Sequence, residues 1–394
     1  MTSGLSVTDG AAWRSFCDRL AVVGESILAG DLQDERTRVE GFHHLATQVV
    51  TWLAWSAGHH DLEHPAFFRQ NDLVSCWGGP NVNQVTRRTR VVPTGRYVIR
   101  GRMHACDDLV ITVKGGDMHM DRYDVLAELM ASDVGIGRDD EVEIFLGGAP
   151  LGDGVPWLPL PSGSSMLNIR EYYWTWTAEE PAVMTVHRLD TVGISPESLT
   201  GVDVAEMLDE AATIVEQSMR YWAEWMETQR DQVGVNSMGA PYPSDGGSSF
   251  IRYGFGFYEL QEDEVFLIES EIAECAYWDI QLYTPMWFES PDFANRVTSL
   301  NHTQAHLSSD GRFRAVVAHS DPGVPNWLDT SGRPSGMVTY RWIRGLDAPA
   351  ARGRVISLAE LADHLPVDTP TVTPAKRADE IAVRQEHVAW RYRT

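Results

Sequence analysis

Short runs with the alternation of β-strands dominate the last third of the chain. Between Phe250 and about Ile343 the runs FGFYEL, VFLIES, YWDIQLYT, FRAVVAHS and MVTYRWI follow one another with turns between them. Strands of this length and spacing are typical of an antiparallel β-sandwich or jelly roll, which buries one face of each sheet. We therefore predict a jelly-roll-like domain in this part of the chain.

Helical and strand-like periods alternate in the rest of the sequence. Apolar residues at helical spacing predict two antiparallel helices from Ala11 to about Trp55, with Gly30–Asp31 ending the first helix. Ser195–Pro196–Glu197 opens a further stretch, in which the spacing predicts about seven helical turns. The segments RYVIRGRM and DLVITVKGG predict hairpin strands, and EVEIFLGG predicts another strand.

These patterns together predict an α+β protein. It combines an antiparallel β-sandwich or jelly-roll-like C-terminal domain with a second β domain and flanking helices. The expected ranges are an N-terminal helical hairpin at 1–75, a first β domain at 76–194, a bridging helix and Gly/Pro-rich linker at 195–249, the jelly-roll-like domain at 250–345 and a tail with a terminal helix at 346–394.

The charge balance restricts the partners. The chain has 32 Lys and Arg against 56 Asp and Glu, a formal charge of −24, so its field repels phosphate groups and argues against nucleic acid or an anionic membrane surface. No apolar stretch is long enough to span a membrane. The four cysteines form no Cys-x-x-Cys pair. We expect reduced, mostly buried thiols in a cytoplasmic protein, and homo-oligomer formation stays open.

No cofactor is expected. Gly135-Ile136-Gly137 lacks the third glycine of a dinucleotide loop, and neither Gly-Lys-Ser/Thr nor Gly-x-Ser-x-Gly occurs. The nucleotide-dependent and serine-elbow classes of enzyme are therefore not indicated.

The densest polar and aromatic cluster runs from His319 to Asp329. A strand is expected to end at His319, and two prolines then shape a loop that contains Asp321, Asn326 and Trp327. A histidine beside a carboxylate can act as a general base, because the carboxylate orients the imidazole ring. Alternatively, Asp321 and Asn326 cap the turn and Trp327 fills the core.

Histidines near this cluster also raise a metal hypothesis. His302, His306 and His319 would suit a metal ion. However, the segment LNHTQAHL lies between strands, where residues four apart are about 13 Å apart. Solvated or capping histidines explain this spacing more simply, and a metal-dependent enzyme is the third hypothesis.

Two strand patterns suggest further ligand contacts. On the YWDIQLY strand Asp279, Gln281 and Tyr283 share one face. If this face is buried, Asp279 needs a partner such as an arginine or a substrate, and if it is wet Asp279 has no special role. Tyr172 and Trp174 are expected to share one side of an aromatic strand, where they would line a pocket or form core.

Several of these segments resemble a known family. The runs YWDIQLY, SLNHTQAHLSSDGRFRAVVAHSDPGVPNWLDTSG and VTYRWI are similar to bacterial proteins that carry the domain of unknown function 1214, and a weaker resemblance covers ERTRVEGFHHLA, Trp77-Gly78-Gly79-Pro80-Asn81, REYYWTWTAEEPAVMTV and EHVAWRYR. The resemblance implies a jelly-roll-like C-terminal domain joined to a second β domain, and it implies no particular activity.

The first functional hypothesis is a cofactor-independent enzyme of lyase, hydrolase or isomerase type. It would act on a small, largely apolar organic molecule in an inter-domain cleft. His319, Asp321 and Asp279 are the expected catalytic residues. The expected substrate-binding residues are Trp77, Asn81, Tyr172, Trp174, Tyr283, Asn301, Asn326 and Trp327. The second hypothesis is a non-catalytic module that binds a carbohydrate, a lipid or a partner chain.

Overall fold

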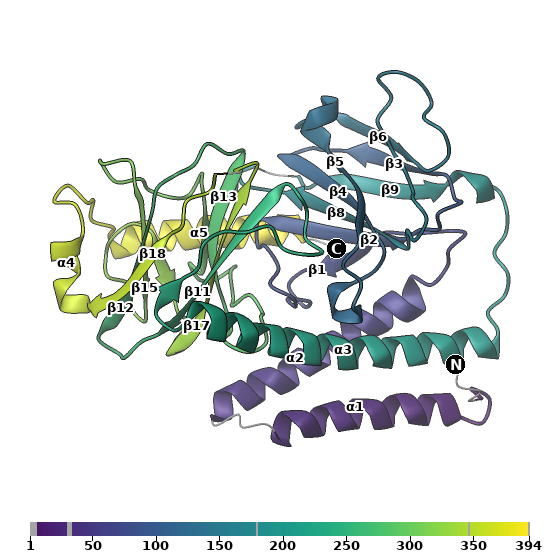
Figure 1. Cartoon of the computed structure of the whole chain (residues 1–394), viewed down its shortest axis with the longest axis horizontal. Helices are drawn as coiled ribbons and strands as arrows, with labels where there is room; N and C mark the ends of the chain where they lie inside the picture. Colours follow the sequence, from purple (N-terminus) through teal and green to yellow (C-terminus); the bar gives the residue numbers. More distant parts are fainter. Residues whose placement is uncertain (1–5, 30–33, 179, 346, 393–394) are drawn as a thin grey trace. The chain divides into compact units, whose positions relative to one another are not determined.

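The structure is a computed structural model that describes residues 6–29, 34–178, 180–345 and 347–392. The chain forms two compact units, each built from several segments (Figure 1). Unit 1 contains Met1–Trp77, Gln84–Tyr172 and Pro181–Ala223, and unit 2 contains Gly78–Asn83, Tyr173–Glu180 and Glu224–Thr394. The five sequence ranges expected above remain predictions, since these units are interleaved along the chain.

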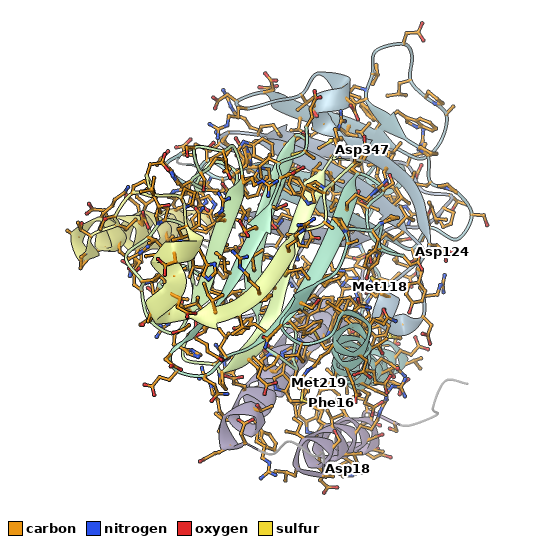
Figure 2. The ribbon with its side chains drawn as sticks, turned by 60° about the vertical axis from the view of Figure 1, so that its left-hand side comes forward. Phe16, Asp18, Met118, Asp124, Met219 and Asp347 are labelled. Carbon is orange, nitrogen blue, oxygen red and sulfur yellow. The ribbon has the colours of Figure 1, made fainter. Side chains whose placement is uncertain are left out.

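Three helices pack together in unit 1. They are α1 (Ala11–Ala29), α2 (Glu35–Leu53) and the first part of α3 (Gly201–Val233). Asp34 caps α2, because its side chain accepts from the Thr37 backbone N–H at 2.7 Å. Phe16 points from α1 towards α3 and lies in an apolar cluster with Leu208, whereas Asp18 points away from it (Figure 2). The expected helical hairpin is present, and its turn at Gly30–Asp31 lies outside the described residues.

Helix α3 begins later and is longer than predicted. The segment at 195–200 is not helical, because Thr200 and Asp203 cap the helix reciprocally: Asp203 accepts from the Thr200 backbone N–H at 2.7 Å, and Thr200 Oγ1 accepts from the Asp203 N–H at 3.3 Å. The helix then continues for 33 residues.

Two sheets complete unit 1. The first has the order β1 (Phe68–Asn71), β2 (Gln84–Arg90), β8 (Met166–Tyr172), β4 (Asp108–Lys114) and β5 (Val125–Met130), and the second β7 (Trp157–Leu158), β6 (Glu141–Leu146), β3 (Tyr97–Arg102) and β9 (Val183–Arg188). The predicted strands exist. Strand β4 pairs antiparallel with the next strand, β5, as a hairpin after DLVITVKGG predicts, whereas β3 lies in the other sheet between β6 and β9.

The aromatic segment after β8 is not a strand. The strand ends at Tyr172, and the carbonyl of Trp174 accepts instead from the side chains of Asn301 (3.0 Å) and Thr303 (2.6 Å). The prediction that Tyr172 and Trp174 share a strand face is therefore wrong, because side-chain donors replace the ladder bonds beyond Tyr172.

Unit 2 is a β-sandwich. One sheet has the order β10 (Ser237–Met238), β11 (Ile251–Glu259), β17 (Ser335–Ile343), β13 (Tyr277–Tyr283) and β14 (Ser299–Asn301), and the other β16 (Trp327–Asp329), β15 (Phe313–Ala318), β12 (Glu264–Ser270) and β18 (Arg352–Ser357). All pairs are antiparallel except β15 with β16. Trp278, Ile280 and Leu282 of β13 lie in the core, as their alternation predicts. The α+β fold with sandwich-like β domains is thus confirmed.

Short helical turns and the terminal helix complete the chain. The turns are η1 (Ala54–Gly58), η2 (Met118–Met120), η3 (Ala131–Val134), η4 (Leu189–Thr191), η5 (Leu358–Glu360) and the helix α4 (Leu361–His364). Helix α5 (Pro374–Arg391) follows Thr373, whose side chain accepts from the Lys376 N–H at 3.2 Å. Among the described helices, none has the length and apolar character needed to cross a membrane.

The cap of α5 gives a first test. Replacing Thr373 by Ala removes an N-cap and is expected to lower the free energy of unfolding by about 1 kcal/mol. Thr371→Ala, at an exposed position two residues earlier, is the matched control and is expected to change it by less than about 0.5 kcal/mol. Urea unfolding of both variants measures the difference, and equal values would contradict the capping role.

Candidate functional site

The polar face of β13 is buried. Tyr277, Asp279, Gln281 and Tyr283 are each at most 1% exposed, so the buried alternative holds and the wet one is wrong. Asp279 accepts from the Tyr277 hydroxyl at 2.5 Å and lies 3.4 Å from Nη1 of Arg341, its ion-pair partner from the neighbouring strand β17. Burial raises the pKa of Asp279, although Arg341 and Tyr277 oppose this shift.

This face holds a backbone segment. Tyr283 and Gln281 donate to the carbonyl of Pro80 at 2.8 and 3.0 Å, and Nη2 of Arg341 donates to the carbonyl of Gly79 at 2.9 Å. The small cavity beside β13, of about 10 Å³, lies among apolar side chains of the sandwich core on the other face of the strand. The geometry therefore supports a structural role for Asp279 in fixing Gly78–Asn83.

The expected substrate-binding asparagines belong to the same network. Asn301 donates to Asn83 Oδ1 at 2.7 Å, and Asn81 donates to the Tyr277 hydroxyl at 3.3 Å. Trp174 packs against Tyr277 and the ring of His302, with centroids 5.7 and 5.6 Å apart. The structure thus brings Asn81, Trp174, Tyr283 and Asn301 together. Their hydrogen bonds go mainly to one another and to neighbouring residues of the same network.

Trp77 and Tyr172 belong to unit 1. Trp77 is 4% exposed and packs against Trp52 and His119, and Tyr172 is fully buried at the end of β8. Each side chain is part of the packed interior of that unit.

His319 and Asp321 have different partners. Nδ1 of His319 lies 2.8 Å from the Thr330 hydroxyl, whereas Asp321 accepts from the Gly323 N–H at 2.9 Å and from Arg377 Nε at 2.9 Å. No hydrogen bond or ion pair joins His319 to Asp321 within the described chain. As the structural alternative anticipated, Asp321 supports the turn.

The loop after β15 nevertheless borders a cavity of about 250 Å³ in unit 2. Asn326 lies in the wall of this cavity, and its side-chain amide already has hydrogen-bond partners. Oδ1 accepts from the His306 N–H, and Nδ2 donates to the carbonyls of His306 and Arg314, at 2.7–2.8 Å. Asn326 therefore shapes the turn, where it adopts a φ of 56°. Trp327 is 8% exposed and lies under the Arg377 guanidinium, 5.3 Å from its ring centroid.

Helix α5 forms the opposite wall of this cavity, which we call the α5 cavity. Its lining residues are Val297, Leu300, Gln304, His306, Pro325, Asn326, Pro370, Val372, Lys376, Arg377, Glu380, Val383 and Arg384. Sequence reasoning missed the arginines of α5. Their spacing could have indicated them, because Arg377, Arg384 and Arg391 recur every seven residues and so share one helix face.

Arg384 is a buried cation without a buried anion beside it. It is 3% exposed, and its guanidinium donates to the Phe293 carbonyl (3.2 Å) and to the hydroxyl and carbonyl of Ser299. It forms no ion pair with any described carboxylate. Burial lowers its pKa to about 9, although the charge of Glu380, one turn earlier on α5, opposes this shift. The indole of Trp176 lies 4.9 Å from the guanidinium and gives partial compensation.

Further along α5, His387 and Arg391 repeat this pattern. Arg391 is 1% exposed, and its Nη1 donates to the carbonyl of Val82. Its Nε lies 2.9 Å from Nε2 of His387, which stacks on Trp176 at 4.8 Å. Burial and the neighbouring arginines lower the pKa of His387, so the imidazole is neutral.

The described residues contain no group of three or more His, Cys, Asp or Glu side chains that could hold a metal ion. His302 packs against aromatic rings, His306 lies at the α5 cavity and His319 bonds to Thr330. We therefore build no mechanism on a metal.

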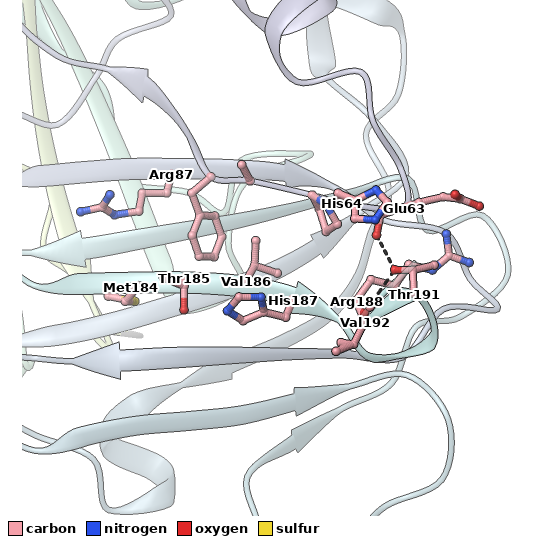
Figure 3. A pocket seen from close by; sticks show the side chains of 14 residues that line it. Glu63, His64, Arg87, Met184, Thr185, Val186, His187, Arg188, Thr191 and Val192 are labelled. Carbon is pink, nitrogen blue, oxygen red and sulfur yellow. Dashed lines mark hydrogen bonds between the residues drawn. The ribbon is translucent and has the colours of Figure 1, made fainter. Parts of the chain in front are cut away.

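Unit 1 contains two larger cavities. The first, of about 570 Å³, runs along β9, with Met184 to Arg188 on one side and Glu63 to Phe67 on the other (Figure 3). Its polar groups fix the surrounding loops: Thr191 donates to the carbonyl of Glu63, and Arg188 donates to that of Leu62 at 3.1 Å. Arg188 also lies 3.9 Å from Asp190, and Arg87 pairs with Glu171, so each arginine of this cavity has a carboxylate beside it.

The second cavity, of about 610 Å³, borders a cluster of buried titratable groups. Arg88 pairs with Asp117 at 2.5 Å, and Lys114 and His119 are 4% and 2% exposed. Burial lowers the pKa of Lys114 to about 8 and that of His119 to about 4. Burial alone would raise the pKa of Asp117, but the charges of Arg88, His119 and Lys114 lower it to about 2.

Comparison with known proteins supports the fold. No family model matches the chain, so the resemblance to the domain of unknown function 1214 stays a prediction. No curated protein matches either. An uncharacterized protein from Burkholderia cenocepacia, known as a crystal structure, is similar over 89% of this chain and 98% of its own, with 28% identity and a TM-score of 0.83. The VPA0106 protein from Vibrio parahaemolyticus covers 79% of this chain and 98% of its own, with 11% identity and a TM-score of 0.46.

The Asp279–Arg341 pair allows a stability test. Replacing Asp279 by Asn leaves the Arg341 guanidinium buried without a carboxylate, and breaking such a pair costs about 3–5 kcal/mol. We expect D279N to lower the free energy of unfolding by this amount. The double variant D279N/R341M is expected to recover at least half of it, because no lone charge is left. Urea unfolding measures both, and a near-wild-type D279N would contradict the role of the pair.

His119 predicts a pH dependence. Its folded pKa of about 4 lies below the ordinary 6.5, so between these values the unfolded chain binds a proton that the folded chain lacks. Its contribution to stability is complete above pH 6.5 and is lost as the pH falls towards 4. We expect H119F to reduce the slope of unfolding free energy against pH by up to about 1.4 kcal/mol per unit in this window. An unchanged slope in denaturant unfolding would contradict a neutral, buried imidazole.

Proposed function

We propose that the protein binds a small, partly apolar organic anion in the α5 cavity. The observation that carries the proposal is Arg384, a 3% exposed guanidinium that lines the cavity and has no described carboxylate partner. Burying an uncompensated charge is costly, and a bound anion would offset this cost.

The balance of charges around the cavity favours an anion. Arg377 is satisfied, because Asp321, Glu380 and the carbonyl of Val324 accept its donors at 2.6–2.9 Å. Lys376 and Arg384 remain without carboxylate partners among the described residues. Two cations thus stay available in a protein with a formal charge of −24, and this local charge is opposite in sign to that of the whole chain.

The remaining lining determines the shape of the ligand. Its apolar members come from the sandwich, the preceding loops and α5: Val297, Leu300, Pro325, Pro370, Val372 and Val383. A volume of about 250 Å³ lies just below the usual range of about 300–1,000 Å³ for ligand pockets. This supports a compact ligand with one charged group and an apolar body, such as an aromatic or branched monocarboxylate.

A cofactor-independent enzyme is the second candidate. His306 and Glu380 both line the α5 cavity, so a proton acceptor and a carboxyl group are available beside a bound molecule. Acid–base chemistry of lyase, hydrolase or isomerase type would then use His306, whereas His319 and Asp321 lie outside this lining. All four cysteines are free, which supports a cytoplasmic location. The expectation that they are mostly buried is wrong, because only Cys106 is buried and Cys17 is exposed.

The binding proposal predicts a preference for charge. Benzoate is expected to bind more tightly than benzamide, which has the same shape without the charge. R384M is expected to weaken benzoate binding about tenfold or more, since it removes a charged hydrogen-bond donor. Isothermal titration calorimetry measures both ligands. R354M, which removes an arginine of the same unit that is 48% exposed, is the matched control and should bind like the wild type.

A second variant keeps the test possible if R384M does not fold. Circular dichroism and the melting temperature show whether R384M is folded, and if it is not, K376Q replaces it, because Lys376 is exposed. K376Q is expected to weaken benzoate binding a few-fold and to leave benzamide unchanged. Equal affinities for benzoate and benzamide, or a folded R384M with wild-type affinity, would refute the proposal.

A further inference from the structure

The 610 Å³ cavity of unit 1 lies between β2, the turn after β4 and one face of α3. Its apolar and aromatic lining consists of Trp55, Met120, Met166, Ala205 and Ile214. Trp55 and Met166 are nearly fully buried. Sulfur atoms and an indole provide good contacts for a flat ring, and the volume lies within the range of ligand pockets.

Two arginines project into this cavity from the same face of β2, because Arg88 and Arg90 are two residues apart. Their guanidinium groups lie 4.4 and 4.5 Å from the ring of Trp55. Arg90 has a carboxylate and a carbonyl partner: it pairs with Glu210 at 2.7 Å and donates to the carbonyl of His59 at 2.9 Å.

Arg88 is only half engaged. It is 0% exposed, its Nη2 pairs with Asp117 and its Nε donates to the sulfur of Met166 at 3.1 Å, but its Nη1 has no hydrogen-bond partner in the described chain. An orphaned buried donor on a cation is costly. Lys114 is buried too and interacts electrostatically with Arg88 and Asp117, so it adds a further positive charge behind the cavity lining. The deep end of the cavity is therefore short of one anionic acceptor.

The outer rim of the cavity carries negative charge. Glu206 and Glu210 are one turn apart on the same face of α3. Glu210 pairs with Arg90 and Asp209 pairs with Arg19. Glu206 is exposed, lines the cavity and has no partner among the described residues. Arg90 and Glu210 thus pair with each other. Arg88 has one N–H donor without an acceptor, and the carboxylate of Glu206 has no cation beside it among the described residues.

We infer that this cavity binds a small zwitterion, whose carboxylate contacts Arg88, whose flat apolar body packs on Trp55, Met120 and Met166, and whose ammonium group faces Glu206. The site is distinct from the α5 cavity, which lies in unit 2. A dianion such as phosphate is disfavoured, because Asp117, Glu206, Asp209 and Glu210 all line this cavity.

Methionine methyl groups allow a site-specific test. The full-length protein carrying R384M, which removes the proposed anion site of unit 2, is labelled with ¹³C at its methionine methyls. Substitution by Leu assigns Met120 and Met166. The probe 4-(aminomethyl)benzoate is expected to shift both signals saturably and at lower concentration than 4-methylbenzoate or benzylamine, each of which lacks one charged end.

The rim variant separates the two ends. E206Q is expected to weaken binding of 4-(aminomethyl)benzoate about fivefold and to leave 4-methylbenzoate unchanged. E197Q, an exposed carboxylate of the same unit outside the cavity, is the control and should change neither. The inference is overturned if the zwitterion shifts neither methionine saturably, if 4-methylbenzoate or benzylamine binds as tightly, or if E206Q has no effect on the zwitterion.

Discussion

The placement of buried positive charge is the constraint on which the interpretation of unit 2 depends. Two buried arginines of this unit differ in their compensation. Arg341 has Asp279 at 3.4 Å and further acceptors in Tyr283 and Gly79, and the network around it is sealed. Arg384 has only carbonyl and hydroxyl acceptors and borders a cavity. The cation with an ion-pair partner has a structural role, whereas the one that forms no ion pair indicates a site for an anion.

Unit 1 contains a similar contrast. Arg90 and Arg88 leave β2 on one face, and Arg90 donates to Glu210 and to the carbonyl of His59, whereas Arg88 has a donor without a partner in the described chain. In both units it is a guanidinium group with incomplete compensation, beside a cavity of suitable size, that identifies the candidate site. His319, on which the first hypothesis concentrated, instead contacts the Thr330 hydroxyl.

Local patterns in the sequence predicted what local physics controls. The alternation in YWDIQLY correctly separates the core face from the polar face of β13, and the helical spacing locates α1, α2 and α5. The sequence also offered a turn-capping role for Asn326, as the alternative to substrate binding, and the structure shows Asn326 in that turn. Errors arose where a distant segment supplies the partners, as when side chains of Asn301 and Thr303 end the strand after Tyr172.

The candidate sites depend on contacts between segments far apart in sequence. Nothing near Asp279 in the sequence reveals that Arg341 lies beside it, 62 residues away. Nor does α5 by itself reveal that its arginines meet no carboxylate. The seven-residue spacing of Arg377, Arg384 and Arg391 shows only that they share a face, and the fold decides that Asp321 pairs with the first of them.

Crystals of the protein grown with 4-bromobenzoate, with diffraction recorded at the bromine absorption edge, test the anion site at Arg384 most directly. We expect an anomalous peak in the α5 cavity, with the carboxylate about 3 Å from the Arg384 guanidinium. A cavity that contains only ordered water at saturating ligand, or a bromine peak with the carboxylate turned away from Arg384, would contradict it.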